Sequence, residues 1–155
     1  GFLTVHLVMP RKKTGAVRSK KKTVDGITFE SMLEAYCYAS LQLKGLDFKY
    51  EGESITLLPS FRSVDTYYKS VPKTKSLVAY GGKTQRPITY KPDFVSHTHK
   101  FYIETKGFVP SQHTFTVRWK LFLKWLNDNG KSDYKIFLVK NQSQVDEAIN
   151  IILNG

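Results

Sequence analysis

The sequence has a single cysteine, no long apolar run and few acidic residues. Because Cys37 is alone, no intrachain disulfide can form, and a reducing compartment is expected. The apolar stretch at residues 2–9 is too short to span a bilayer, and basic residues follow it instead of a cleavage site. These absences predict a cytoplasmic protein that does not contact a membrane.

The shortage of acids leaves a large positive charge. The chain has 24 Lys and Arg against 13 Asp and Glu, a net charge of +11, which indicates a polyanionic partner. Residues 1–22 contain no acid, and the rest of the chain carries only about +4. This segment is a candidate for sequence-independent DNA phosphate binding, although a solvated tail or a localisation signal has the same composition. Its bases are Arg11, Lys12, Lys13, Arg18, Lys20, Lys21 and Lys22.

The length of 155 residues, of which 41% are hydrophobic, predicts one packed domain. We expect a basic arm over residues 1–23 and a single domain over residues 24–155.

The spacing of apolar residues predicts a mixed α/β fold, a mixed β-sheet core flanked by α-helices. A first helix is expected over 28–44 with Thr28 as its N-cap, a second over 114–129, and a third after the cap Ser143. Extended segments are expected within 47–58, over 134–139, and in a hairpin whose strands, 88–95 and 101–105, are joined by a five-residue loop. Residues 60–87 show no clear pattern.

The predicted hairpin carries Pro92-Asp93 on one strand and Glu104-Thr105-Lys106 on the other. Because side chains alternate along a strand, Glu104 and Lys106 should share a face that Asp93 can approach, while Thr105 points to the other face. Carboxylates this close repel one another unless a cation such as Mg²⁺ or Mn²⁺ lies between them. The spacing therefore predicts metal-dependent phosphodiester hydrolysis, with Lys106 acting on the attacking water or on the transition state. An exposed Glu104–Lys106 ion pair on an edge strand, with Asp93 closing a turn, is the structural alternative.

Residues 88–94 and 103–107 resemble the signature of the PD-(D/E)XK nuclease superfamily, and more narrowly that of phage endonuclease I, the junction-resolving enzyme of T7-like phages. Residues 31–34 and 44–51 resemble the first helix and the next strand of that family. The resemblance implies a restriction-endonuclease-like fold in which Glu34 joins the acidic cluster from the first helix, with Glu30 as the second choice. The catalytic residues it implies are Glu34, Asp93, Glu104 and Lys106, and the metal-binding residues are Asp93, Glu104, Thr105 and Glu34.

The resemblance also implies a function in DNA recombination. It implies a Mg²⁺- or Mn²⁺-dependent endonuclease that resolves branched DNA such as four-way Holliday junctions, working as a homodimer that can exchange strands, in the host cytoplasm if a phage encodes it. Arg118, on the second helix, would add to the DNA-binding residues. The segment between Glu51 and Ile88 is longer than in the phage enzyme, and about four extra residues precede the basic helix that begins near Arg118. These departures concern dimer geometry and junction selectivity more than cleavage. A nicking or restriction-type nuclease of the same superfamily, and a catalytically silent nucleic-acid-binding module, remain as alternatives.

Overall fold

The computed structural model describes residues 21–107 and 113–155, and its centre is a mixed four-stranded sheet. The strand order is β12 (Lys135–Val139), β11 (Phe101–Thr105), β10 (Phe94–Ser96) and β3 (Lys49–Tyr50). β11 and β12 are parallel, and the other neighbours are antiparallel.

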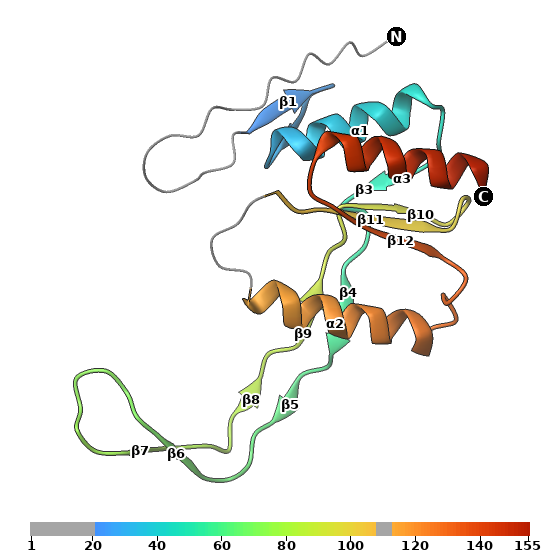
Figure 1. Ribbon diagram of the computed structural model, residues 1–155. Coiled ribbons are helices and arrows are strands. Elements are labelled where there is room, and N and C mark those ends of the chain that lie inside the picture. The colour runs from blue at the N-terminus through green and yellow to red at the C-terminus, as the bar shows by residue number, and fades with distance from the viewer. Residues whose placement is uncertain (1–20, 108–112) are drawn as a thin grey trace.

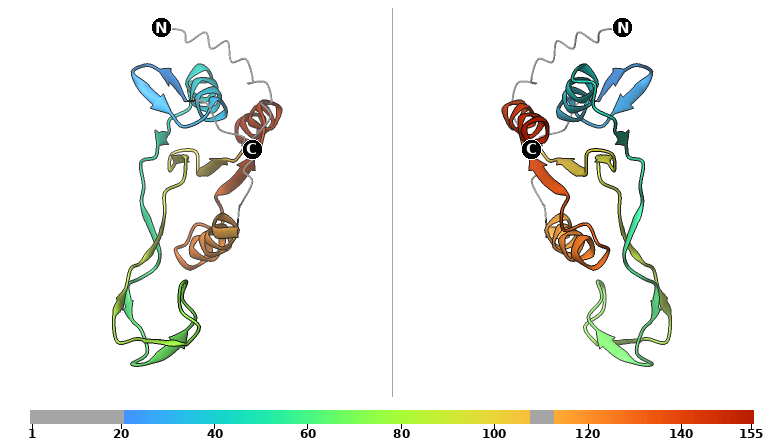
Figure 2. Two further views of the ribbon diagram at one scale, coloured as in Figure 1. Left: turned by 90° about the vertical axis from the view of Figure 1, so that its left-hand side faces the viewer. Right: turned by 90° about the vertical axis from the view of Figure 1, so that its right-hand side faces the viewer.

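Helices cover both faces of this sheet. α1 (Met32–Leu43) and α3 (Gln142–Asn154) lie on one face, and α2 (His113–Asp128) lies on the other (Figures 1 and 2). The predicted mixed sheet flanked by helices is confirmed, and so are the second helix and the strand after it. No helix in the described ranges is long and apolar enough to cross a membrane.

The two helical layers explain why every residue of β11 is buried. Phe101 and Ile103 pack in the cluster formed with α1 and α3, whereas Tyr102 packs against Phe122 of α2. Strand alternation thus divides β11 between two cores. A strand in this position can carry a polar residue only where that residue finds a partner.

The start of the first helix differs from the prediction. Residues 22–29 form a hairpin of β1 (Lys22–Val24) and β2 (Ile27–Phe29), which turns at Asp25 and Gly26, both with positive φ. Thr28 therefore lies in a strand and is not the N-cap. Ser31 has extended backbone and caps α1 by accepting a hydrogen bond from the Glu34 amide at 3.1 Å.

The cap of the last helix was also predicted wrongly. Asn141, not Ser143, is the N-cap of α3, and its side chain accepts from the Gln144 amide at 2.9 Å. Ser143 already lies within the first turn, where its backbone is helical and cannot cap.

The predicted strand over 88–95 is two strands. β9 (Ile88–Tyr90) and β10 are separated at Pro92, which has no amide hydrogen to continue a ladder. Asp93 thus precedes β10 instead of lying within a strand. The hairpin of β10 and β11 has a loop one residue shorter than predicted, because Ser96 pairs with Phe101.

Residues 53–92 form a two-stranded antiparallel extension that leaves the body of the molecule (Figures 1 and 2). Near the body, β4 (Ile55–Leu58) pairs with β9, and the buried Ile55 and Tyr90 belong to the α2 core. Farther out, β5 (Phe61–Arg62) pairs with β8 (Thr84–Gln85), and β6 (Tyr67–Lys69) pairs with β7 (Val78–Tyr80). We call the outer part, residues 60–87, the ribbon.

Candidate active site

Several polar side chains meet at one end of the central sheet. Glu51 follows β3, Asp93 precedes β10, and Thr105 ends β11, so the antiparallel pairing brings these positions to the same edge. The amide of Glu51 donates to the carbonyl of Asp93 at 2.8 Å, and the amide of Lys106 donates to the carbonyl of Val139 at 2.7 Å. Glu34, in the first turn of α1, reaches this edge from above the sheet.

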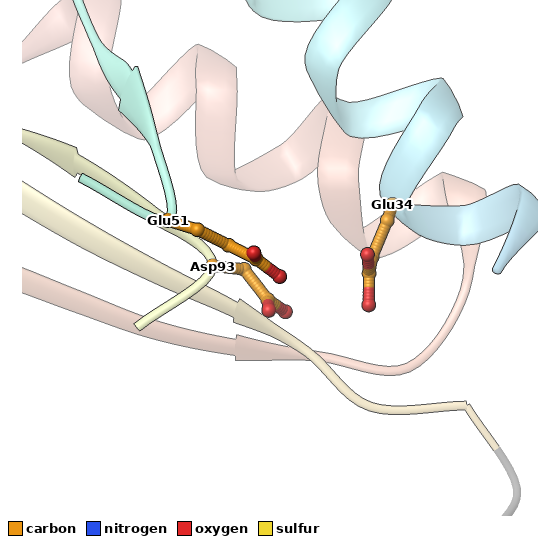
Figure 3. A group of neighbouring side chains, drawn as sticks. All are labelled: Glu34, Glu51 and Asp93. Atoms are coloured by element: carbon orange, nitrogen blue, oxygen red, sulfur yellow. The ribbon is translucent and has the colours of Figure 1, made fainter. Parts of the chain in front are cut away.

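Four carboxylates form what we call the carboxylate cluster. Glu34, Glu51 and Asp93 offer oxygens that all lie within 4.8 Å of one another (Figure 3). Glu104 joins them through Asp93, because the two carboxyl groups are close enough for each to affect the pKa of the other. Asp93 and Glu104 are each only 7% exposed. The structural alternative of an exposed Glu104–Lys106 ion pair is therefore wrong, since β11 is a central strand and its acid is buried.

Hydroxyl groups fix three of these carboxylates. Tyr50 donates to Glu34 at 2.7 Å, and Tyr90 donates to Glu104 at 2.8 Å. Asp93 accepts from both the amide and the hydroxyl of Thr105, each at 2.8 Å. Asp93 can reach Thr105 although alternation directs Thr105 to the other face, because Asp93 lies beyond the strand end and bridges both faces.

Glu34, Asp93 and Glu104 lie in an environment that disfavours their charged forms. Burial, and then the charge of Asp93, raise the pKa of Glu34 to about 7. Burial and the neighbouring Glu104 raise the pKa of Asp93 to about 8. Burial raises the pKa of Glu104 to about 7, although Tyr90 and Lys106 act in the opposite direction. Without a compensating cation, the cluster therefore holds protons at neutral pH.

Lys106 approaches the cluster from the α2 side of the sheet. Its ammonium group lies 4.3 Å from the centre of the Phe115 ring, and its charge lowers the pKa of Glu104. The aromatic face stabilises the ammonium without neutralising it. Lys106 is thus positioned beside the carboxylates and retains its positive charge for a further partner.

The predicted DNA-binding residues fall into three groups. Arg118 lies on α2, where its charge acts on Tyr90, and its Nε is buried without a hydrogen-bond partner in the described part of the chain. Lys22 begins β1, and Lys21 lies 3.8 Å from Glu30, so Glu30 is outside the carboxylate cluster. The remaining predicted residues lie outside the described residues: Arg11, Lys12, Lys13, Arg18 and Lys20.

Glu51, Tyr50 and Tyr90 are site residues to which the sequence analysis gave no role. Glu51 has a positive φ of 50°, an unfavourable backbone conformation for a residue with a side chain, and its carboxylate lies beside Asp93. The sequence feature that could have identified Glu51 is an acid that directly follows a short strand and precedes Gly52. No signal in the sequence could have identified the two tyrosines, because their partners are distant in the chain.

Comparison with known proteins gives a family but no activity. Residues 14–140 match the family model described as "Protein of unknown function (DUF1064)". No curated protein and no solved structure matches the chain.

Proposed function

The chain belongs to the DUF1064 family, and we propose that it is a metal-dependent DNA endonuclease that hydrolyses phosphodiester bonds. The observation that supports this proposal is the carboxylate cluster with Lys106 beside it. Buried acids with raised pKa values cost stability, and such groups are typical of sites that bind a cation or transfer protons.

The donor set fits a hard divalent cation. Glu34, Glu51 and Asp93 provide carboxylate oxygens, the ligand type that Mg²⁺ and Mn²⁺ prefer, and Glu104 lies next to Asp93. When bound, the cation would neutralise these acids, polarise the scissile phosphate and lower the pKa of a water molecule. Thr105, which was predicted as a metal ligand, instead donates to Asp93 and would orient that carboxylate.

Lys106 and Arg118 supply positive charge on the α2 side of the site. Lys106 would orient the attacking water or stabilise the negative charge that develops on the phosphate. Arg118, whose charge acts on Tyr90 beside Glu104, would bind a phosphate oxygen. Tyr50 and Tyr90 remain protonated, because burial and the adjacent carboxylates raise their pKa values, so they hold Glu34 and Glu104 as donors throughout.

The resemblance to the PD-(D/E)XK nucleases, and to phage endonuclease I within them, supports a finer proposal. Branched DNA such as a four-way junction would be the preferred substrate, and a homodimer would place two sites for paired cuts. A single chain provides one carboxylate cluster, which is consistent with one incision per protomer.

Cleavage of a labelled four-way junction, compared with a linear duplex of the same sequence, tests the proposal. We expect wild-type protein to cut the junction with Mg²⁺ and not with EDTA, and Asp93→Ala to bind the junction without cutting it. Glu147→Gln is the matched control, because Glu147 is an exposed acid on α3 and should leave cleavage unchanged.

Equal cutting of both DNAs would support a nicking or restriction-type nuclease and remove the junction preference. Tight, salt-sensitive binding without cutting in any divalent metal would contradict the enzyme and leave a nucleic-acid-binding module.

A further inference from the structure

We propose that the ribbon, residues 60–87, is a DNA-binding element that enters a groove of the duplex and holds the substrate beside the carboxylate cluster. This inference deepens the proposed function and rests on it for the identity of the substrate. It assigns a second binding surface, separate from the basic N-terminal segment.

The charge of the described chain is concentrated on the ribbon. Residues 60–87 have a net charge of +5, whereas the other described residues, 21–59, 88–107 and 113–155, sum to +1. The single acid of the ribbon, Asp65, is paired with Arg62 at 3.3 Å. The bases of the ribbon are Arg62, Lys69, Lys73, Lys75, Lys83 and Arg86. This density of positive charge on one thin element matches the phosphate backbone of a polyanion.

The shape of the ribbon also fits a duplex. A two-stranded antiparallel ribbon is about 5 Å between strand axes, and the major groove of B-form DNA, about 12 Å wide, admits it. All residues of β5 and β6 are exposed, so the outgoing strand of the ribbon is accessible along both paired segments. At the tip, Lys73 and Lys75 precede Leu77, which is 68% exposed. An apolar side chain near two lysines at the end of a projecting ribbon is suited to contact the edges of DNA bases or to insert between two stacked base pairs.

The two faces of β6 and β7 present different chemistry. Tyr67 and Tyr80 lie opposite each other with stacked rings 5.8 Å apart, and the Lys69 ammonium lies 4.5 Å from the Tyr80 ring centre. Tyr68 points to the other face and is 64% exposed. Aromatic rings combined with ammonium groups are a common means of holding nucleic acid without strict sequence preference.

The ribbon is connected directly to the catalytic end of the sheet. Its second strand continues through β9 into Pro92 and Asp93, and Tyr90 of β9 donates to Glu104. An extended strand from residue 78 to residue 90 would span at most roughly 40 Å, which is close to one turn of B-form DNA. DNA held along the ribbon would thus be positioned relative to the carboxylate cluster by a short, paired element.

The same charge argues against a second copy of the ribbon as the occupant of this surface. Two ribbons of +5 each would repel, and the exposed Leu77 lies two residues after Lys75 at the tip. A polyanion removes this repulsion. We therefore assign the surface to DNA, and self-association through the ribbon becomes an outcome of the test.

The test measures DNA binding by the full chain in EDTA, so that cleavage plays no part. The ribbon variant Lys73→Gln/Lys75→Gln/Lys83→Gln is compared with the body variant Lys44→Gln/Lys131→Gln/Lys140→Gln, which removes the same charge. Fluorescence anisotropy with a labelled duplex of about 30 base pairs, roughly three helical turns, gives the dissociation constant over a range of salt concentrations. Because the ribbon lysines are exposed, the ribbon variant should keep the thermal unfolding temperature of the wild type; the body variant should lose a few degrees at most, since Lys44 and Lys140 are exposed and only Lys131 is half-buried.

We expect the ribbon variant to bind at least roughly tenfold more weakly than the body variant at moderate salt, with a salt slope reduced by about 2 to 3. Equal affinities and equal slopes for the two variants would overturn the inference. Sedimentation of the same proteins without DNA provides a second criterion. A wild-type dimer that the double variant Tyr68→Ser/Leu77→Ser makes monomeric, with the DNA affinity per chain unchanged, would assign the ribbon to self-association and also overturn it.

These results are independent of the cleavage test. Loss of binding in the ribbon variant, together with a wild type that cuts no DNA in any metal, would uphold the ribbon and reject the endonuclease. If the wild type cuts DNA but the ribbon variant binds DNA as tightly as the wild type, the endonuclease is upheld and the role of the ribbon in DNA binding is rejected.

Discussion

At the end of the sheet, acids from separate elements lie close together and two of them, Asp93 and Glu104, are buried, whereas on the ribbon the basic residues are exposed and separated. Asp93 and Glu104 are held by packing from α1, α2 and two neighbouring strands, and their hydroxyl partners come from distant parts of the chain. The lysines of the ribbon need no such support, because solvent stabilises their charge. In the proposed endonuclease, cleavage would therefore depend on packing in the core, while binding to a polyanion would depend on accessible charge.

The largest expected effect contrasts the packing of the two regions. Phe122→Ala should lower the free energy of unfolding by about 3–5 kcal/mol, because Phe122 is fully buried and lies against Tyr90 and Tyr102. Phe61→Ala, on the ribbon, should cost below about 1 kcal/mol, since Phe61 is 50% exposed. Urea denaturation measures both. Similar losses for the two variants would mean that the ribbon is part of the core.

The second effect separates cleavage from binding. Lys106→Met should lower the single-turnover cleavage rate at saturating DNA by about 10²–10³-fold, because it removes the positive charge beside the carboxylates. Lys83→Met should raise the DNA concentration needed for half-maximal cleavage and leave the saturated rate unchanged. Lys44→Met, an exposed change on the body, is the control. If the cleavage rate at saturating DNA falls equally in the Lys106 and Lys83 variants, the two lysines do not have separate roles in cleavage and in binding.

The third effect is a pH dependence of stability. The pKa values of Glu34, Asp93 and Glu104, about 7 to 8 in the folded protein, lie above those of the unfolded chain, so the folded state binds more protons between about pH 4 and pH 8. In EDTA, the contribution of these groups to stability is therefore complete below about pH 4, and it should be lost progressively as the pH rises to 8.

Asp93→Asn should flatten this dependence, and Mg²⁺ should restore stability at pH 8 in the wild type only. Urea denaturation at several pH values measures the effect. If the stability of the metal-free protein rises from pH 5 to pH 8, the pKa values of these acids are not raised in the folded state.

The smallest effect concerns one hydroxyl group. Tyr90→Phe removes the donor to Glu104 and should cost about 0.5–1.5 kcal/mol of stability. Because this hydrogen bond lowers the pKa of Glu104, its loss should move the rise of the cleavage rate to higher pH. Tyr68→Phe, on the ribbon, should change neither quantity. An unaltered pH–rate profile in Tyr90→Phe would show that this hydroxyl does not tune the site.

Local patterns in the sequence were sufficient to predict much of the body. The spacing of Phe115, Trp119 and Phe122 identified α2, and the apolar run before Lys140 identified β12. Alternation predicted that Glu104 and Lys106 share a face, and both contact the α2 side: Tyr90 of the α2 core donates to Glu104, and Lys106 lies over Phe115. Helix caps were predicted less well, because Thr28, Ser31, Asn141 and Ser143 all have suitable side chains and only backbone geometry selects among them.

The sequence by itself determined which chemical groups are available. It provides a basic chain, the pair Pro92-Asp93, and the segment Glu104-Thr105-Lys106, whose side chains alternate between the two faces of a strand. Only the tertiary structure decided that Glu51 lies beside Glu34 and Asp93, that Tyr50 and Tyr90 hold two of the acids, and that residues 60–87 project as a ribbon. The physical reason is the range of the interactions. Periodicity and turn preferences act over a few residues, whereas the carboxylate cluster and the ribbon depend on pairing between strands far apart in the chain, which no local pattern encodes.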